Sequence, residues 1–204
     1  MSLPCAWVMM AVPERCGSVE FLRAQIPSLR VIEDTDHAGN RVTMLRAWQA
    51  GVETGAAWVG VLQDDILLCD DFPARAVARL REAQDLGARA VSFYSQRRSV
   101  ADALARGDRW WQQPAGQFCN DQAVALTRDL ADRLVEWIQP HLAEHRHWSD
   151  VLLADFLAHQ SESIWQTSPS LVQHRLDLPS VIGCPPLLYG QYVRQAKTWS
   201  PAAS

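Results

Sequence analysis

An apolar run that ends in two adjacent carboxylates constrains this sequence more than any other feature. Residues 57–62 (AWVGVL) have the length and side chains of a buried strand, and they stop at Gln63-Asp64-Asp65. Open α/β sheets bind ligands at the carboxyl ends of their parallel strands. Because adjacent carboxylates repel each other, we expect a positive partner there, and a divalent cation with oxygen ligands is the natural candidate. A strand that runs into an acidic surface turn is the alternative.

Strand and helix patterns alternate along the chain. Short apolar runs predict strands at residues 6–12, 29–32, 57–62, 90–94 and 122–126, with a short β-like stretch at 163–166. Periodic apolar positions predict helices at residues 19–26, 41–54, 72–86, 128–138 and 150–159. Ser18 is the expected N-cap of the first helix, and Pro140 is expected to end the fourth. This order predicts an α/β fold, a three-layer sandwich with a mostly parallel central sheet.

Composition sets limits on the class of protein. The 204 residues carry a net charge of −4, with 48% hydrophobic and 21% charged residues, as in one soluble globular domain. The acidic balance argues against a general nucleic-acid coat. The five cysteines are odd in number and form no CxxC pair, which favours reduced thiols. No signal peptide and no membrane-spanning run is visible, so we expect a cytoplasmic protein.

Polar clusters follow three of the predicted strands. They are Pro13-Glu14-Arg15, the acids Asp34 and Asp36, and Gln63-Asp64-Asp65. Because parallel strands end at the same edge of a sheet, we expect these clusters to line one crevice. Residues 95–120 form a long connection rich in arginine and aromatic side chains, of the kind that often makes a binding wall.

Three motifs together give the chain a resemblance to a known family. They are VLQDD (61–65), HWSD (147–150) and SPSLVQH (168–174). With the strand and helix order, they resemble glycosyltransferases of the GT-A fold, in a small bacterial or phage-type form. The resemblance implies a catalytic domain over residues 1–180 and a loop-rich tail over 181–204. It also implies a hexosyltransferase-type enzyme that moves a sugar from a nucleotide sugar to an acceptor hydroxyl, with a UDP sugar as the expected donor.

The resemblance assigns roles on the donor side. Members use a DxD-like motif to bind Mn²⁺ or Mg²⁺ that bridges the donor diphosphate, and here Asp65 is the implied metal ligand. Gln63 departs from the Asp-x-Asp pattern, which puts one donor contact in doubt. A late histidine often completes the metal site, and His174 fits; an ordinary strand-end histidine is the alternative. The implied donor-binding residues are Val12, Pro13, Arg15, Asp34, Asp36, Arg41, Gln63 and Asp64.

On the acceptor side, inverting members use a late acid to deprotonate the acceptor hydroxyl. Asp150 is the implied base and Asp121 the rival; an acid in the first turn of a helix is the structural alternative. The implied acceptor-binding residues are Trp110, Trp111 and Gln122, with a place in the core as the alternative for one of the two tryptophans. The acceptor itself stays open between a protein, a glycan, a small molecule and a hydroxymethylated base in phage DNA. The acidic net charge weighs against DNA, whereas an arginine run beside Trp110 favours it: Arg97, Arg98, Arg106 and Arg109. A solvated helix and its connection is the alternative for this run.

Two other functions remain open from the sequence. A nucleotidyltransferase would also use carboxylates and Mg²⁺ on a similar sheet, but it normally needs a glycine-rich, basic phosphate loop early in the chain. Residues 12–18 (VPERCGS) contain a single glycine, which ranks this function lower. A non-catalytic module that binds a nucleotide sugar is the other alternative, and Gln63 in place of an acid favours it.

Overall fold

The computed structural model describes residues 4–114, 116–142, 148–175, 177–178 and 196–201. Its strands are β1 (Cys5–Ala11), β2 (Arg30–Glu33), β3 (Trp58–Gln63), β4 (Ile66–Leu68), β5 (Ala90–Ser92), β6 (Trp110–Gln113), β7 (Ala123–Thr127), β8 (Ile164–Thr167) and β9 (Val172–His174). Its helices are α1 (Cys16–Gln25), α2 (Asn40–Val52), α3 (Phe72–Asp85), α4 (Arg98–Ala105), α5 (Arg128–His141) and α6 (Ser149–His159), with a 3-10 turn η1 at Pro13–Arg15.

Seven of these strands form one central sheet in the order β2-β1-β3-β7-β5-β8-β6. The pairs β1/β2, β1/β3 and β5/β8 are parallel, whereas β7 runs against β3 and β5, and β6 runs against β8. Five strands therefore point one way and two the other, which confirms a mostly parallel sheet. A small second sheet consists of β4 and β9, which pair in antiparallel with Ile66 opposite His174.

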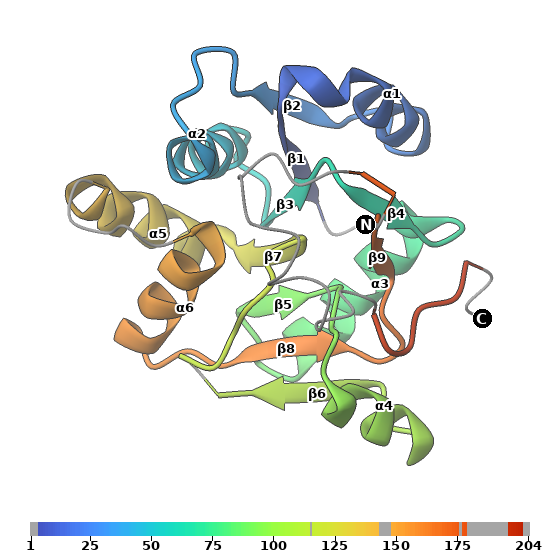
Figure 1. Cartoon of the computed structure of the whole chain (residues 1–204). Helices are drawn as coiled ribbons and strands as arrows, with labels where there is room; N and C mark the ends of the chain where they lie inside the picture. Colours follow the sequence, from blue (N-terminus) through green and yellow to red (C-terminus); the bar gives the residue numbers. More distant parts are fainter. Residues whose placement is uncertain (1–3, 115, 143–147, 176, 179–195, 202–204) are drawn as a thin grey trace, which may run out of the picture.

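Helices cover both faces of the central sheet, as Figure 1 shows. Successive residues of β1 point to opposite faces: Met9 lies in the core under α1 and α3, and Met10 lies in the core under α2, α5 and α6. The β4/β9 sheet packs on the first of these faces, where Ile66 and Val172 are fully buried. The predicted three-layer α/β sandwich is confirmed.

Several local predictions were wrong or incomplete. The 95–120 connection contains α4 and β6, and neither β4 nor β9 was predicted. Helix α5 continues through Pro140 to His141, because a proline in the last turn removes only one intrahelical hydrogen bond. Helix α1 begins at Cys16, so Ser18 lies inside it and donates its hydroxyl hydrogen bond to the backbone oxygen of Asp64 instead of capping the helix.

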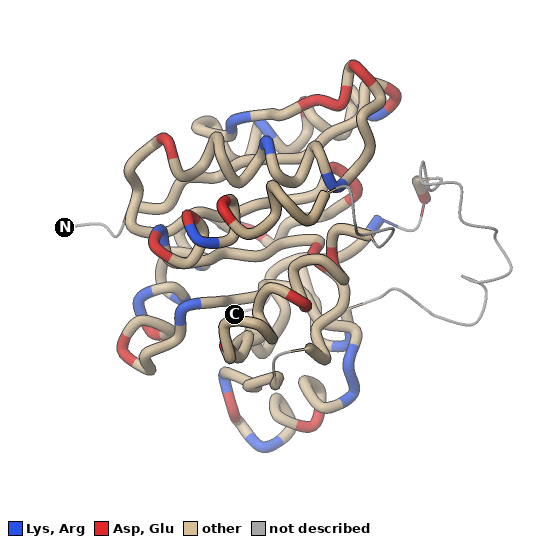
Figure 2. The backbone as a smooth tube through the Cα atoms, turned by 90° about the vertical axis from the view of Figure 1, so that its left-hand side faces the viewer, with Lys and Arg blue, Asp and Glu red and all other residues tan. Residues whose placement is uncertain are grey.

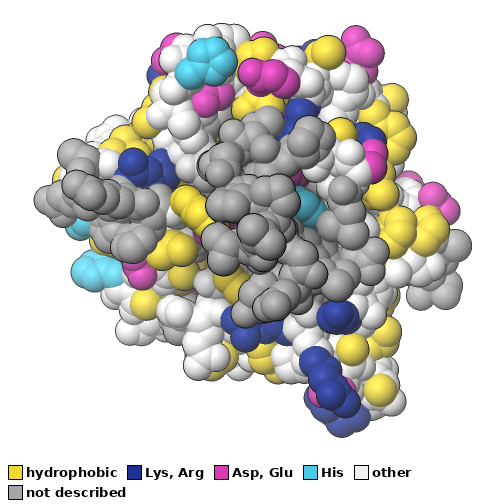
Figure 3. Space-filling view, in the orientation of Figure 1, with side chains coloured by type: hydrophobic (Ala, Val, Ile, Leu, Met, Phe, Trp, Pro, Cys, Tyr) yellow, Lys and Arg dark blue, Asp and Glu magenta, His cyan; other side chains and the backbone are white. Residues whose placement is uncertain are grey.

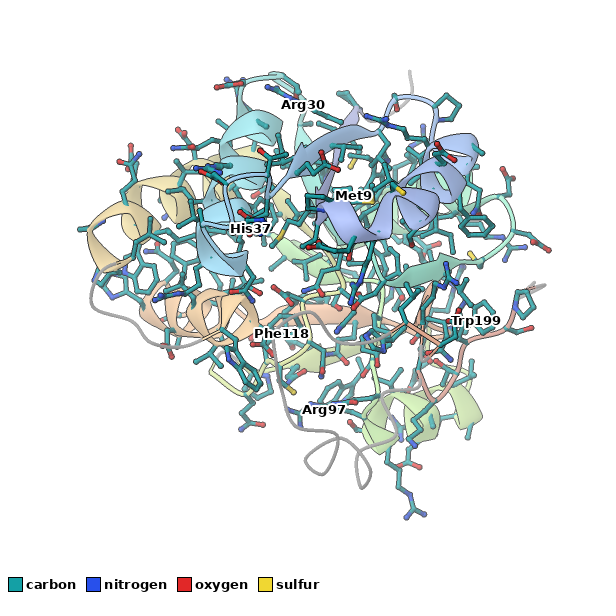
Figure 4. All side chains as sticks on the ribbon, turned by 45° about the horizontal axis from the view of Figure 1, so that its top comes forward. Met9, Arg30, His37, Arg97, Phe118 and Trp199 are labelled. Carbon is teal, nitrogen blue, oxygen red and sulfur yellow. The ribbon has the colours of Figure 1, made fainter. Side chains whose placement is uncertain are left out.

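The segment 196–201 packs against the small sheet. The backbone N–H of Ala196 donates to Oε1 of Gln173 at 2.8 Å, and the N–H of Asp70 donates to the carbonyl of Pro201 at 2.9 Å. Figure 4 shows Trp199 on the side of the molecule where β4 and β9 lie. The expected domain boundary at residue 180, most of the tail 181–204, and His147 of the HWSD motif lie outside the described residues.

Charges of both signs are mixed over the helices and loops (Figure 2). Within the described ranges, no helix is both long and apolar enough to cross a lipid bilayer.

Gly60 allows an aromatic ring to lie across β3. A Cβ atom at this position would stand 2.3 Å from Cζ3 and 2.4 Å from Cε3 of Trp7. The Trp7 ring is only 5% exposed and packs 5.1 Å from the ring of Phe72 and 5.8 Å from that of Phe93. The ring therefore has no room to move away, and glycine is required by close approach.

We expect Gly60→Ala to lower the free energy of unfolding by about 1–3 kcal/mol, because the added methyl group overpacks this core. Urea titration followed by circular dichroism measures it. Gly17→Ala in α1 is the matched control: no atom lies within 4 Å of a Cβ at that position, so alanine should be neutral or stabilising. Equal stability of the two variants would contradict the packing role of Gly60.

Candidate active site

A buried ion cluster lies at the carboxyl ends of β1 and β3. Asp64 and Asp65 form the turn that follows β3, and Arg15 ends the 3-10 turn that follows β1. Nη1 of Arg15 lies 2.6 Å from Oδ1 of Asp64 and 3.0 Å from Oδ2 of Asp65. The backbone N–H of Val12 donates to Oδ2 of Asp64 at 2.9 Å. One guanidinium therefore lies between both motif carboxylates, with the Arg15 and Asp64 side chains each 7% exposed.

The small sheet brings a histidine to the same place. Because Ile66 pairs with His174 in the β4/β9 ladder, the residue before β4 lies next to the end of β9. The backbone N–H of Arg175 donates to the carbonyl of Asp65 at 2.7 Å, which extends this pairing. Nε2 of His174 lies 3.3 Å from Oδ2 of Asp65, across 109 positions of the sequence. We call Arg15, Asp64, Asp65 and His174 the acid–histidine centre.

The two carboxylates of this centre have different electrostatic environments. Burial is the largest influence on Asp64 and raises its pKa above the ordinary value, although Arg15 and the Val12 N–H act in the opposite direction. Burial also acts to raise the pKa of Asp65, but the hydrogen bond and charge of His174, together with Arg15, outweigh it and leave that pKa lowered. Asp65 is therefore the carboxylate that stays ionised more readily.

The donor atoms of Asp65 and His174 suit a divalent cation. Two cis ligands of an octahedral ion at about 2.1 Å lie about 3 Å apart, close to the 3.3 Å between Oδ2 of Asp65 and Nε2 of His174. Oδ1 of Asp65 and Nδ1 of His174 are also buried and have no hydrogen-bond partner among the described residues. The described ranges contain no group of three or more His, Cys, Asp or Glu that would hold a metal alone. Water and substrate phosphate would complete the coordination, as is common for Mg²⁺.

A second group of polar side chains lies beside this centre. Because β7 runs antiparallel to β3, its first residues lie at the carboxyl end of β3, where the Gln63 N–H donates to the carbonyl of Gln122 at 2.9 Å. Nε2 of Gln63 donates to Oδ1 of Asp121 at 2.5 Å. Asp121 is hydrogen-bonded to the Ser149 side chain at the start of α6. The N–H of Asn120 donates to Oδ2 of Asp150 at 3.1 Å. We call Gln63, Asn120, Asp121, Ser149 and Asp150 the acidic junction.

Asp121 is the most perturbed acid of this junction. Burial, reinforced by the negative charges of Asp150 and Asp65, raises the pKa of Asp121 to about 7. The hydrogen bond from Ser149 opposes this change and does not cancel it. Strong perturbation by burial and by other acids is typical of functional sites. The influence of Asp65 and Asp150 on the same carboxyl shows that the acid–histidine centre and the implied base lie within electrostatic reach of each other.

Most of the other residues that the resemblance assigns to donor binding form hydrogen bonds or ion pairs within the chain. Asp34 is buried and accepts hydrogen bonds from the N–H groups of Ala38 and Gly39, so it shapes the loop before α2. Asp36 forms a two-pronged ion pair with Arg46, at 2.7 Å for each contact. Arg41 donates to the carbonyl of Leu142 at 3.1 Å. Pro13 begins the 3-10 turn that carries Arg15.

The implied acceptor residues fall in two places. Gln122 is buried at the acidic junction, and its Oε1 has no hydrogen-bond partner within the described ranges. Trp110 and Trp111 lie on β6, the edge strand four positions from β3, or roughly 19 Å at the usual strand spacing. Nε1 of Trp110 donates to Glu82 at 3.3 Å, and its ring packs edge-on against Trp165. Trp110 therefore contributes to the packing between β6, β8 and α3.

Comparison with known proteins supports the fold. No protein-family model matches the sequence, and no curated protein matches it in a sequence search. The crystal structure of A197 from STIV matches at a TM-score of 0.51 and 15% identity, over 84% of this chain and 86% of that one. The crystal structure of a glycosyltransferase involved in glycosylation of the major capsid of PBCV-1 matches at a TM-score of 0.51 and 8% identity, over 85% of this chain and 94% of that one. The chain has a GT-A-like α/β fold, as the resemblance implied.

The pKa of Asp121 predicts a pH dependence of stability. Between the ordinary pKa of an aspartate and about 7, the folded chain binds a proton at Asp121 that the unfolded chain has lost, so the free energy of unfolding falls as the pH rises. Asp121→Asn removes this dependence. We expect the variant to gain stability over the wild type by about 1–3 kcal/mol between pH 4.5 and pH 8.

Urea titrations at several pH values, with EDTA present, measure this difference. Asp85→Asn, at the exposed end of α3, is the control and should follow the wild-type curve. Parallel curves for the wild type and Asp121→Asn would contradict a protonated Asp121 in the folded chain.

Proposed function

We propose that this chain is a divalent-cation-dependent glycosyltransferase that moves a sugar from a UDP sugar to an acceptor hydroxyl. The observation that carries the proposal is the convergence of Asp65 and His174 at the carboxyl end of β3, at a 3.3 Å contact, in a GT-A-like fold. Parallel sheets of this kind bind ligands at that edge. A carboxylate and phosphate oxygens suit both Mn²⁺ and Mg²⁺, whereas the imidazole ligand favours the transition metal Mn²⁺ over Mg²⁺.

On the donor side, Asp65 and His174 would hold the ion, and Asp64 would fix Arg15 beside it. When bound, the ion neutralises the charge that develops on the leaving diphosphate. Arg15 is paired with both carboxylates, so its positive charge would help to attract the donor phosphates only together with the bound ion. The loop at Val12 and Pro13, whose backbone binds Asp64, would contact the nucleotide. Asp34 and Asp36 lie in the next loop of this edge, and Arg41 lies in the first turn of α2 that follows it; all three would support the nucleotide pocket.

On the acceptor side, Asp150 would remove the proton of the attacking hydroxyl. Its Oδ2 accepts from the Asn120 N–H, and its Oδ1 accepts from the Val151 N–H at 2.9 Å. Each oxygen keeps a lone pair for an acceptor hydroxyl. Asp121 is the rival base, but it is more deeply buried and is already bound by Gln63 and Ser149.

A hydroxymethylated base in phage DNA is one candidate acceptor, beside a protein, a glycan or a small molecule. Lys and Arg side chains gather over α4 in Figure 3, where the arginine run lies. Two members of that run are paired with acids, however: Arg106 with Asp108 and Arg109 with Glu82, both at 2.9 Å. Arg97 donates to the carbonyl of Gln117 and holds the loop before β7. This pairing leaves less free positive charge for DNA and favours a smaller acceptor.

Calorimetric titration with UDP and Mn²⁺ tests the donor site. Asp65→Asn and His174→Ala should each weaken metal-dependent UDP binding by at least about 100-fold, because loss of an outer-shell partner alone weakens metal binding 10–100-fold. Asp70→Asn, an exposed acid five positions further along the chain, is the matched control and should bind as the wild type does. UDP binding that is unchanged by EDTA would contradict the proposed cation.

Turnover separates the proposed enzyme from its alternatives. Release of UDP from a UDP sugar supports glycosyl transfer, metal-dependent UDP binding without turnover indicates a non-catalytic module, and release of pyrophosphate from a nucleoside triphosphate indicates a nucleotidyltransferase.

A variant of the proposed base gives a separate test. We expect Asp150→Asn to lower kcat for sugar transfer by about 10²–10⁴-fold, the usual contribution of a general base. The affinity for UDP and Mn²⁺ should stay at the wild-type value, because Asp150 does not belong to the acid–histidine centre. Stopped assays of UDP release with a mixture of glycan and nucleoside acceptors measure kcat, and calorimetry measures binding. A variant with wild-type turnover would remove Asp150 from the mechanism.

A further inference from the structure

Gln63 stands where the DxD-like motif would have its first acid, but its side chain is hydrogen-bonded to Asp121 of the acidic junction. Its Nε2 donates to Oδ1 of Asp121 at 2.5 Å, and this bond joins the end of β3 to the residue two positions before β7. Asp121 is 8% exposed, so it has little access to water in place of this donor. A buried carboxyl group that loses a donor is costly, which makes the Gln63 amide a structural requirement.

Asp121 in turn connects to the helix that carries the proposed base. It is hydrogen-bonded to the Ser149 side chain, which also accepts from Nδ2 of Asn40 at 3.3 Å. One residue before Asp121, the Asn120 N–H donates to Asp150. Segment 120–121 is therefore bound on one side by Gln63 and on the other by the first turn of α6. Displacement of this segment would move the N–H that orients the Asp150 carboxylate.

We propose that Gln63 is a positioning residue for the acceptor base: through Asp121 it fixes the segment whose backbone N–H orients Asp150, and it makes no contact with the donor. This inference rests on the proposed function and assigns the glutamine a different role from the donor-binding acid of the motif. The geometry also explains the choice of side chain. A glutamate at position 63 would place a second carboxylate against buried Asp121, whereas an amide donates to it.

A stability cycle tests the contact without any substrate. At pH 8, Gln63→Leu should lower the melting temperature by about 2–10 °C, because Asp121 loses its donor. Gln63→Glu should also lower it. Adding Asp121→Asn to Gln63→Glu reverses the hydrogen bond, with the new amide as donor. Because Asp121→Asn is itself stabilising at this pH, the substitution should raise the melting temperature more in the Gln63→Glu background than in the wild-type background. Gln84→Leu, at an exposed position of α3, is the matched control and should melt as the wild type does.

Kinetics separate positioning of the base from contact with the donor. For Gln63→Leu we expect kcat to fall by about tenfold or more, since small displacements of catalytic groups are costly. The dissociation constant for UDP and Mn²⁺ should stay within about threefold of the wild-type value. The double variant Gln63→Glu, Asp121→Asn should have a higher kcat than Gln63→Glu alone.

Two results would overturn the inference. One is additive stability changes at positions 63 and 121, which would show that the two side chains do not interact. The other is a Gln63→Leu variant with wild-type kcat and weakened UDP binding, which would return Gln63 to the donor site. If the wild type transfers no sugar while the two positions still couple in stability, the proposed function fails and the Gln63–Asp121 contact stands.

Discussion

The buried contact between Arg15 and two adjacent carboxylates is the constraint on which the rest of the site depends. Removing one partner from a buried ion pair typically costs about 3–5 kcal/mol, because a charge is left without compensation. Arg15 comes from the turn after β1, and Asp64 and Asp65 come from the turn after β3. The two strands must therefore be neighbours in parallel register, as they are, so that their ends meet.

The small β4/β9 sheet supplies the remaining member of the acid–histidine centre. Three residue pairs join these strands. The pair at the end of β9 sets His174 opposite Ile66, the residue that follows Asp65. Gln173 reinforces the arrangement, since its Oε1 accepts from the N–H of His174 at 3.0 Å and from that of Ala196 at 2.8 Å. A late segment of the chain thus braces the strand that carries the histidine.

The sequence predicted the central sheet, and the polar residues at the carboxyl ends of β1 and β3, better than the connections between the elements. The long apolar run at 57–62 and the helix periods around it are local signals, and β3, α2 and α3 follow them closely. β4 and β9 have three residues each and exist through their pairing with each other, so no local pattern marks them. α4 and β6 lie in a stretch whose tryptophans and arginines were interpreted as a binding wall. Trp110 packs against Trp165, which agrees with the alternative that one of the two tryptophans belongs to the core.

Strand direction explains what the sequence could not show of the site. Residues 122–126 were expected to form a strand, but an apolar run carries no sign of its orientation. Because β7 runs antiparallel to β3, its first residue rather than its last lies at the edge where β3 ends. That reversal places Asp121 next to Gln63 and brings Asn120 to Asp150. Asp121 and Asp150 were named as rival bases, whereas the structure makes them parts of one junction.

The charges of the acid–histidine centre show why a resident arginine and a divalent cation are compatible. With both carboxylates ionised and His174 in the neutral form that binds a metal, Asp64 and Asp65 carry two negative charges and Arg15 one positive charge, so one negative charge remains. Asp65 keeps it more readily, since its pKa is lowered while that of Asp64 is raised. A divalent cation would change the net charge of the centre from one negative to one positive. That positive charge would attract a diphosphate. Arg15 alone does not give the centre a net positive charge. The guanidinium would therefore stabilise the fold in the absence of the cation, and the cation would create the affinity for the donor.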